Sequence, residues 1–350
     1  MSERPKFDPL GIILTVPIRR RWRPRDQLGG DAAASAAKSK DRRDRLEQAA
    51  RIVRKAPEVL VKVSGSARGF QHLREHLNYI TRNGELIAET PATGLVAGRD
   101  SVHETAVAWW RQREVVPGTR QKNSRETVNL VLSMPAGTNS DALLEAARRF
   151  AARTFLDHDY LMVMHTPEND PPRKGRAGTK QAHVHLTVKA RGYEGQRLNP
   201  RKEDLQRYRE WFAEALREMG VAAEASPRRA RGVVQKPKRQ SILHLDVRNA
   251  SKIQRAKVAE AVREVTQQVA AGQRPWEDAT WAKQKEIRVA WSTLADRFER
   301  DGAKEGAVFA VEIRRFLSDM PPLETERDTM KRAAVSALNR AKKAEKDRSK

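Results

Sequence analysis

The chain has 350 residues, a formal net charge of +24 at pH 7 and no cysteine. The lack of cysteine excludes disulfides and thiolate metal sites, and the excess of positive charge predicts a polyanionic partner, most often nucleic acid. The apolar run at residues 11–17 is too short to span a bilayer and lacks the features of a signal peptide. The composition therefore predicts a soluble, cytoplasmic protein with no membrane span.

Four segments of different character follow one another along the chain. Residues 1–56 form a basic arm that we expect to be weakly ordered, apart from a helix-like stretch at 41–55. Residues 57–222 have regular hydrophobic periodicity and predict one compact domain. A basic linker at 223–250 then leads to a charged helical region at 251–350. Three tryptophans predict a small helical core in that last region: Trp276, Trp281 and Trp291.

Periodicity within the second segment predicts both strands and helices. Alternating or short apolar runs predict strands at residues 58–64, 126–134, 160–165 and 182–189. Helical spacing predicts helices at 70–82, 102–113, 140–155 and 200–219, the last with a side-chain cap at Asn199 and a proline in its first turn. Regular βαβ spacing is absent, and no glycine-rich phosphate loop follows a strand. We therefore expect an α+β fold, with a mainly antiparallel sheet flanked by helices and a mostly α-helical C-terminal region.

The stretch AHVHLTVK, residues 182–189, carries two histidines on a predicted strand. Side chains alternate along a strand, so His183 and His185 point to one face and Val184 to the other. His165 ends the preceding predicted strand and would join them if the two strands are neighbours. Three imidazoles with open remaining positions are typical of a catalytic metal site, although they do not identify the ion. The alternative is partly exposed histidines that hydrogen-bond to their neighbours.

A second feature lies in HLREHLNYITRNGEL, residues 72–86. The apolar residues of this predicted helix form one stripe, and Tyr79 falls on the other side, near His76 and between Arg74 and Arg82. A phenol needs cations or a base nearby to attack at neutral pH. Tyr79 is therefore a candidate nucleophile, and the alternative is an amphipathic tyrosine on the surface.

Several motifs occur in an order that resembles the relaxase and mobilisation nuclease family, the HUH-type DNA-nicking enzymes of conjugative plasmids and T-DNA border processing. The motifs fall within residues 58–222 and read LNYITRNGEL, LVLSMPAGTN, MHTPEN, HVHLTVK and RLNPRKEDLQRYREWF. The resemblance implies that Tyr79 is the nucleophile. It also implies that His165, His183 and His185 bind a divalent metal ion, Mg²⁺ or Mn²⁺.

The same resemblance implies a reaction and partners. Tyr79 would attack a phosphodiester of single-stranded DNA at a transfer origin, which leaves a 5′-phosphotyrosyl enzyme and a free 3′-hydroxyl. Accessory relaxosome proteins and a type IV secretion coupling protein would be partners, and the protein would be exported with the DNA during conjugation. Basic residues expected to bind the DNA backbone are Arg68, Arg82, Arg173, Lys174, Arg176, Lys180, Arg201 and Lys202.

One position departs from the family pattern. Relatives often carry an acidic residue two positions after the first histidine and soon continue into the second motif. Here that position is Pro167, Glu168 and Asp170 are displaced, and a basic loop separates the motifs. Glu168, Asp170 and His76 are therefore candidates for an acid or for a group that supports the histidines.

Three other functions remain open. An HUH replication initiator usually has its tyrosine after the histidine pair, whereas Tyr79 precedes the pair and Tyr208 falls on an apolar stripe. A 2H phosphodiesterase uses two His-x-Thr motifs and no metal; residues 185–187 and 103–105 match formally, but the second match lies in a predicted helix. A non-catalytic accessory protein that binds the DNA of a mobile element would also explain the composition.

Overall fold

The computed structural model describes most of the chain. The described residues are 7–14, 31–112, 125–172, 178–235, 242, 245–246, 248, 251–267 and 275–348. They form two compact units, one of residues 55–225 and one of residues 1–54 with 226–350.

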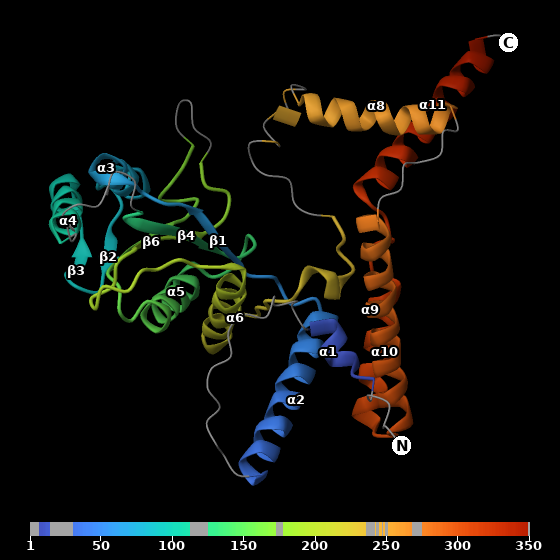
Figure 1. Ribbon diagram of the computed structural model, residues 1–350, viewed down its shortest axis with the longest axis horizontal. Coiled ribbons are helices and arrows are strands. Elements are labelled where there is room, and N and C mark those ends of the chain that lie inside the picture. The colour runs from blue at the N-terminus through green and yellow to red at the C-terminus, as the bar shows by residue number, and fades with distance from the viewer. Residues whose placement is uncertain are drawn as a thin grey trace. The chain divides into compact units, whose positions relative to one another are not determined.

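Residues 55–225 form an α+β unit around one six-stranded sheet with the strand order β1-β4-β6-β5-β2-β3 (Figure 1). Every pair of neighbouring strands is antiparallel, which confirms the predicted fold class. The strands are β1 (Leu60–Gly65), β2 (Ala88–Thr90), β3 (Gly94–Val96), β4 (Thr127–Ser133), β5 (Tyr160–His165) and β6 (His183–Lys189). The hairpin of β2 and β3 was not predicted, because three residues contain too little alternation to identify a strand.

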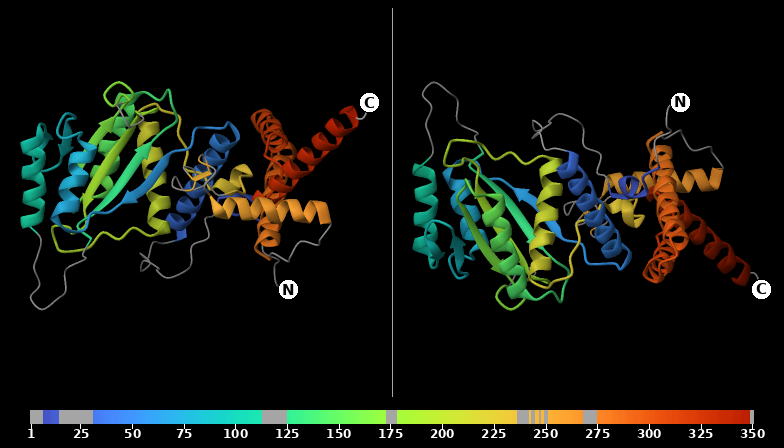
Figure 2. Two further views of the ribbon diagram at one scale, coloured as in Figure 1. Left: turned by 90° about the horizontal axis from the view of Figure 1, so that it is seen from above. Right: turned by 90° about the horizontal axis from the view of Figure 1, so that it is seen from below.

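One face of the sheet is an apolar layer. The residues of β4 and β6 that point to this face are fully or almost fully buried: Val128, Leu130, Leu132, Val184, Leu186 and Val188. Helices α5 (Ser140–Thr154) and α6 (Lys202–Glu218) lie along this face (Figures 1 and 2). Phe150 of α5 packs edge-on against Phe212 of α6, with ring centroids 5.8 Å apart. Alternation in the strands and helical spacing in α5 and α6 thus bury one common core.

The opposite face of the sheet is covered unevenly. Helices α3 (Gly69–Ile80) and α4 (Arg99–Arg111) form an apolar cluster with β2, β3 and β5, in which Leu77 and Val163 are fully buried. At the other edge, Leu60 and Lys62 of β1 point to the same face and are exposed. Residues in the middle of this face are therefore held on rigid strands beside a solvent-accessible surface.

Helix α6 begins at Lys202, two residues later than predicted. The side-chain oxygen of Asn199 accepts a hydrogen bond from Nη1 of Arg125 at 3.2 Å and does not cap the helix. Asp204 closes the first turn, since its Oδ2 accepts from the backbone N–H of Arg201 at 2.8 Å. The residue before a proline favours extended backbone, which is consistent with a helix that starts after Pro200.

The second unit is helical. Its elements are α1 (Pro9–Leu14), α2 (Asp31–Val53), the 3₁₀ turn η1 (Arg228–Arg231), α8 (Lys252–Gln267), α9 (Pro275–Arg300), α10 (Lys304–Ser318) and α11 (Glu326–Arg348). Trp291 is completely buried, and its indole Nε1 donates to the carbonyl oxygen of Ala230 at 3.0 Å. Ile13 of α1 and Ile52 of α2 belong to the same core.

Two details of this unit differ from the sequence-based expectation. Helix α1 buries Ile13, and α2 begins at Asp31, whereas we expected order in this segment only in a helix-like stretch at 41–55. Trp276 and Trp281 are 66% and 38% exposed, so among the three tryptophans Trp291 alone lies in the core. Among the helices of the described residues, none combines the length and the hydrophobicity that a bilayer span requires.

Candidate functional site

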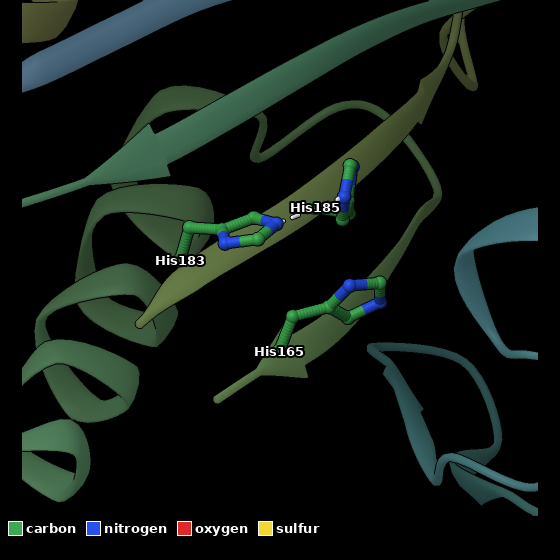
Figure 3. A group of neighbouring side chains, drawn as sticks. All are labelled: His165, His183 and His185. Atoms are coloured by element: carbon green, nitrogen blue, oxygen red, sulfur yellow. Dashed lines mark hydrogen bonds between the residues drawn. The ribbon is translucent and has the colours of Figure 1, made fainter. Parts of the chain in front are cut away.

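The three histidines converge on the unevenly covered face of the sheet (Figure 3). His165 ends β5, His183 begins β6, and the antiparallel register places them opposite each other, while His185 points to the same face two residues later. The ring centroids of His165 and His183 lie 5.1 Å apart, those of His165 and His185 4.6 Å, and those of His183 and His185 5.0 Å. One nitrogen from each ring lies within 4.8 Å of the other two. The three imidazoles are therefore close enough to share one ion.

Burial keeps these imidazoles neutral. Desolvation is the main cause that lowers the pKa of His165 to about 4 and the pKa of His185 to about 2. Desolvation also lowers the pKa of His183. Because a metal ion binds neutral imidazole, the three histidines need not lose a proton before they bind one at pH 7.

His165 has protein partners on both ring nitrogens. Its Nε2 lies 2.6 Å from the carbonyl oxygen of Ile80, and its Nδ1 lies 3.2 Å from Nη2 of Arg82. A carbonyl oxygen only accepts and a guanidinium only donates, so Nε2 carries the proton and Nδ1 accepts. An ion held by all three rings would replace one of these partners. Imidazole nitrogens are common ligands of transition metal ions, whereas Mg²⁺ prefers oxygen ligands.

Arg82 is buried, which makes the prediction that it binds DNA wrong. The residue is 7% exposed, and its Nε and Nη2 each donate to a carboxylate oxygen of Asp170 at 3.0 Å. Asp170 itself is 1% exposed. A guanidinium engaged in a buried two-pronged ion pair is not available to a backbone phosphate.

Of the two acidic residues considered in the sequence, Asp170 lies beside the histidine cluster. Its Oδ2 is 3.6 Å from Nδ1 of His165 and accepts a hydrogen bond from the hydroxyl of Thr179 at 2.7 Å. Glu168 is exposed, and hydrogen bonding with Thr166 is the main cause that lowers its pKa.

Tyr79 lies at the C-terminal end of α3 and is 57% exposed. The central carbon of the Arg82 guanidinium lies 4.8 Å from the centroid of its ring, and Nη1 of Arg82 donates to its carbonyl oxygen. The helix ends here because Arg82 and Asn83 have φ angles of +54° and +59° and Gly84 follows, a left-handed C-terminus. The phenol is therefore accessible, while the next residue, Ile80, contacts His165 through its carbonyl oxygen.

His76 lies one turn before Tyr79 and links α3 to the sheet. Its Nε2 is 3.0 Å from the hydroxyl oxygen of Thr187, two residues after His185 in β6. Burial lowers the pKa of His76 to about 4, so this imidazole is also neutral at pH 7. It is a neighbour of the three-histidine cluster on a different element.

The other predicted DNA-binding residues fall into two groups. Arg68, Lys180, Arg201 and Lys202 are exposed, as contact with a phosphate requires. Arg173, Lys174 and Arg176 lie outside the described residues.

Sequence reasoning did not identify a row of polar side chains on β4 beside the histidines. The hydroxyl of Thr127 donates to the side-chain oxygen of Asn129 at 2.8 Å, and Nε2 of Gln181 donates to the hydroxyl of Ser133 at 3.0 Å. Asn129 pairs with Thr187, and Ser133 pairs with His183, so these groups share one face. The signal was present in the stretch ETVNLVLSM, where polar residues alternate with the apolar ones that enter the core.

Comparison with known proteins finds a similarity to one family in this region. Residues 79–221 match the family model described as relaxase, MobA/VirD2-like, nuclease domain. The relaxase resemblance is confirmed. The matched region begins at Tyr79 and includes the three histidines and Asp170, whereas β1 and most of α3 precede it.

The chain is also similar to curated T-DNA border endonucleases. The T-DNA border endonuclease VirD2 of Rhizobium radiobacter is 24% identical over 219 residues, a match that covers 57% of this chain and 48% of the relative. The protein with the same description from Agrobacterium fabrum is 25% identical over 198 residues, with 51% and 42% covered. The chain thus spans about half or less of the length of the curated relatives that it matches.

Substitution of the histidines tests whether they hold an ion. We expect metal-free protein to bind Mn²⁺ in a calorimetric titration, and a His183→Ala/His185→Ala variant to lose this binding because two of three nitrogen ligands are absent. The loss should exceed the roughly 10–100-fold that removal of a group supporting a ligand costs. His103→Ala, a change at an exposed histidine of α4, is the control and should bind as the wild type does. Equal Mn²⁺ affinity in the double variant and the wild type would contradict the assignment.

The lowered pKa values of His76 and His165 predict a dependence of stability on pH. Each group takes up a proton near pH 6.5 in the unfolded chain but near pH 4 in the folded protein. The unfolded chain therefore binds more protons between these values, so the free energy of unfolding falls as the pH falls from 6.5 to 4, by at most about 1.4 kcal/mol per pH unit for each histidine. Well above pH 6.5 these groups are neutral in both states and contribute no slope. Urea unfolding of metal-free protein at pH 7, 6 and 5 measures the effect, and His76→Asn should make the dependence shallower.

Proposed function

We propose that this chain is a relaxase, which nicks one DNA strand at a transfer origin and stays joined to the 5′ end through Tyr79. The observation that supports this most directly is the exposed phenol at the end of α3, one residue before Ile80, whose carbonyl oxygen contacts His165. A nucleophile next to a cluster of three metal-binding side chains is the arrangement that transfer of a phosphodiester needs. The family match of residues 79–221 supports the same reaction.

The proposed reaction exchanges one phosphate ester for another. The phenol oxygen of Tyr79 attacks the phosphorus and loses its proton, while the bond from phosphorus to the 3′ oxygen breaks and that oxygen takes up a proton. The products are a 5′-phosphotyrosyl enzyme and a free 3′-hydroxyl. Water is not consumed, so attack by a 3′-hydroxyl on the phosphotyrosine can rejoin a strand. A divalent ion held by His165, His183 and His185 would polarise the scissile phosphate as a Lewis acid.

The chain holds the reacting groups on fixed elements. His165 and His183 are paired residues of two central strands, and Tyr79 is in the last turn of α3. His76 joins that helix to β6 through the hydroxyl of Thr187. Such a scaffold keeps the phenol and the histidines in one geometry before DNA binds, which reduces the barrier to the attack.

The DNA strand would lie on the exposed part of the histidine face. Lys62 is in register with Val131 and His185, and Leu60 is in register with Ser133 and His183, so β1 adds a cation and an apolar side chain to the same surface. The ammonium of Lys62 suits contact with a phosphate of single-stranded DNA, and the side chain of Leu60 suits contact with a base. The net charge of +24 favours DNA as substrate. Accessory relaxosome proteins and a secretion coupling protein are proposed partners, with the cytoplasm as the location before export.

The surroundings of the other three tyrosines favour Tyr79 as the nucleophile. Tyr208 is 7% exposed, and burial raises its pKa to about 12, so it does not supply the late tyrosine of a replication initiator. Tyr160 is partly buried, with a raised pKa. Tyr193 donates its hydroxyl to Asp159 at 2.7 Å and follows the end of β6 opposite to the histidines.

The structure also argues against a 2H phosphodiesterase. His103 lies in the middle of α4 and stacks edge-on against Phe70, with ring centroids 6.2 Å apart. The hydroxyl of Thr105 donates to the carbonyl oxygen of Ser101 inside the helix. A catalytic His-x-Thr pair on a strand is therefore absent at residues 103–105.

Covalent capture of DNA tests the proposed function. The full chain is incubated with single-stranded oligonucleotides that tile a candidate origin, in the presence of Mn²⁺, and adducts are separated on denaturing gels. We expect an adduct with one oligonucleotide, lost on addition of EDTA and in Tyr79→Phe because the nucleophilic oxygen is absent. Tyr193→Phe removes the hydroxyl of another exposed tyrosine and should leave the adduct unchanged.

Two outcomes would reject the proposal. An adduct that persists in Tyr79→Phe would show that another residue is the nucleophile. Tight binding of every oligonucleotide without any adduct would favour the non-catalytic accessory protein.

The proposed division into a nicking domain and a separate helical region is also testable. Every described group of the site lies within the compact unit of residues 55–225. We therefore expect a fragment of residues 55–225 to form the adduct at the rate of the full chain, and transfer between cells to require the remaining residues. A folded fragment without cleavage activity would show that the helical unit contributes to the reaction.

A further inference from the structure

We infer that Arg82 is a positioning residue that fixes the ring of Tyr79 and the imidazole of His165 in one geometry, with Asp170 as its anchor. The inference rests on the proposed function, since it concerns the orientation of the proposed nucleophile. It replaces the predicted role of Arg82 in DNA binding, which its burial rules out.

Arg82 contacts three elements of the site with different nitrogens. Nη1 donates to the carbonyl oxygen of Tyr79, and the guanidinium lies over the ring of the same residue, 4.8 Å from its centroid. Nη2 donates to Nδ1 of His165 at 3.2 Å and to Asp170 at 3.0 Å, and Nε donates to the second oxygen of Asp170 at 3.0 Å. The planar guanidinium has its five N–H groups in a fixed fork, so these contacts set the relative positions of their partners.

Asp170, which anchors Arg82, is held in turn by hydrogen bonds within the loop after β5. Asp170 accepts from the hydroxyl of Thr179, and the backbone N–H of Thr179 donates to the carbonyl oxygen of Asp170 at 3.0 Å. The backbone N–H of Asp170 donates to the carbonyl oxygen of Thr166, also at 3.0 Å. The two ends of the basic loop are thereby tied to the group that orients Arg82.

The contact of Arg82 with Tyr79 lies on the ring face, which leaves the phenol oxygen free for a phosphate. Tyr79 is 57% exposed although its ring is held against a residue that is 7% exposed. An exposed side chain at a helix end would otherwise sample several rotamers. Arg82 restricts the ring of Tyr79. Because the positive charge of Arg82 is paired with Asp170, the guanidinium does not itself bind the DNA phosphate.

The arrangement also explains why an arginine fits this position better than a lysine. A lysine ammonium is a compact point charge and cannot reach two carboxylate oxygens, a ring nitrogen and a ring face at once. The inference therefore predicts that retention of the positive charge at residue 82 is not sufficient for activity.

Two substitutions separate positioning from a purely structural role. In Arg82→Met/Asp170→Leu the buried ion pair is replaced by apolar side chains, a change that folded proteins often tolerate. In Arg82→Lys the charge is kept but the fork is lost. The matched control is Arg148→Met/Glu89→Leu, which removes another two-pronged arginine–carboxylate pair, between α5 and β2, at 2.8 and 2.7 Å.

The experiment uses the full chain and the oligonucleotide on which the wild type forms its adduct. Thermal unfolding reports folding, fluorescence anisotropy reports the Kd for the oligonucleotide in EDTA, and a Mn²⁺ titration reports the histidine cluster. Single-turnover adduct formation at saturating DNA then reports the reaction alone.

We expect both Arg82 variants to fold and to bind the oligonucleotide with the wild-type Kd. The rate of adduct formation should fall roughly 100-fold in the double variant and roughly 10-fold or more in Arg82→Lys, as misplacement of a reacting group by about 1 Å predicts. The Arg148→Met/Glu89→Leu control should react at the wild-type rate.

The outcomes distinguish the inference from the proposed function. If the wild type forms no adduct, the proposed function fails. If the wild type reacts and a folded Arg82→Lys variant reacts equally fast, the positioning role is wrong. If the double variant unfolds, Arg82→Lys still decides the question, because a structural role predicts an unchanged rate wherever the variant remains folded.

Discussion

The register between β5 and β6 is the constraint on which the site depends. It pairs His165 with His183, and a slip of one residue would turn one strand's side chains to the other face of the sheet. The apolar layer under α5 and α6 determines this register, since Met162 pairs with Leu186 and both are buried there. The position of the three imidazoles is therefore set by hydrophobic burial on the opposite face of the same strands.

A second constraint comes from the ion pair of Arg82 and Asp170. Burial of two charges costs several kcal/mol for each ion, and a left-handed arginine adds roughly 1–2 kcal/mol of backbone strain. The two-pronged geometry and the bonds to His165 and Thr179 offset part of this cost. Both charged residues lie outside regular structure, one after α3 and one after β5, so the pair joins these two segments in addition to the contact of Ile80 with His165. Such a pair adds little to the stability of the fold. Its role is better explained by the defined geometry that it gives to the surroundings of Tyr79.

The sequence predicted those parts of the molecule that depend on local pattern. Alternation identified the four long strands and placed His183 and His185 on one face, and helical spacing placed Tyr79 on a polar side. Sequence alone could not show that Arg82 is buried, because its partner is 88 positions away and lies in a loop without periodicity. The same limit applies to Trp276 and Trp281, whose exposure depends on which helices pack together. Local pattern predicts the face of an element, whereas burial of a loop residue depends on tertiary contacts.

The ion pair of Arg82 and Asp170 places both a hydrogen-bond donor and an acceptor near Nδ1 of His165. In the present arrangement Arg82 donates to Nδ1, which requires the proton on Nε2. If Nε2 held an ion, the proton of the neutral ring would be on Nδ1, and the partner of that nitrogen would be Asp170, which Arg82 holds in place. Oδ2 of Asp170 lies 3.6 Å from the same nitrogen and is an acceptor. A carboxylate that accepts from a metal-binding imidazole fixes the ring and increases its basicity. The arginine–carboxylate pair beside Nδ1 thus contains a partner for either neutral tautomer of His165.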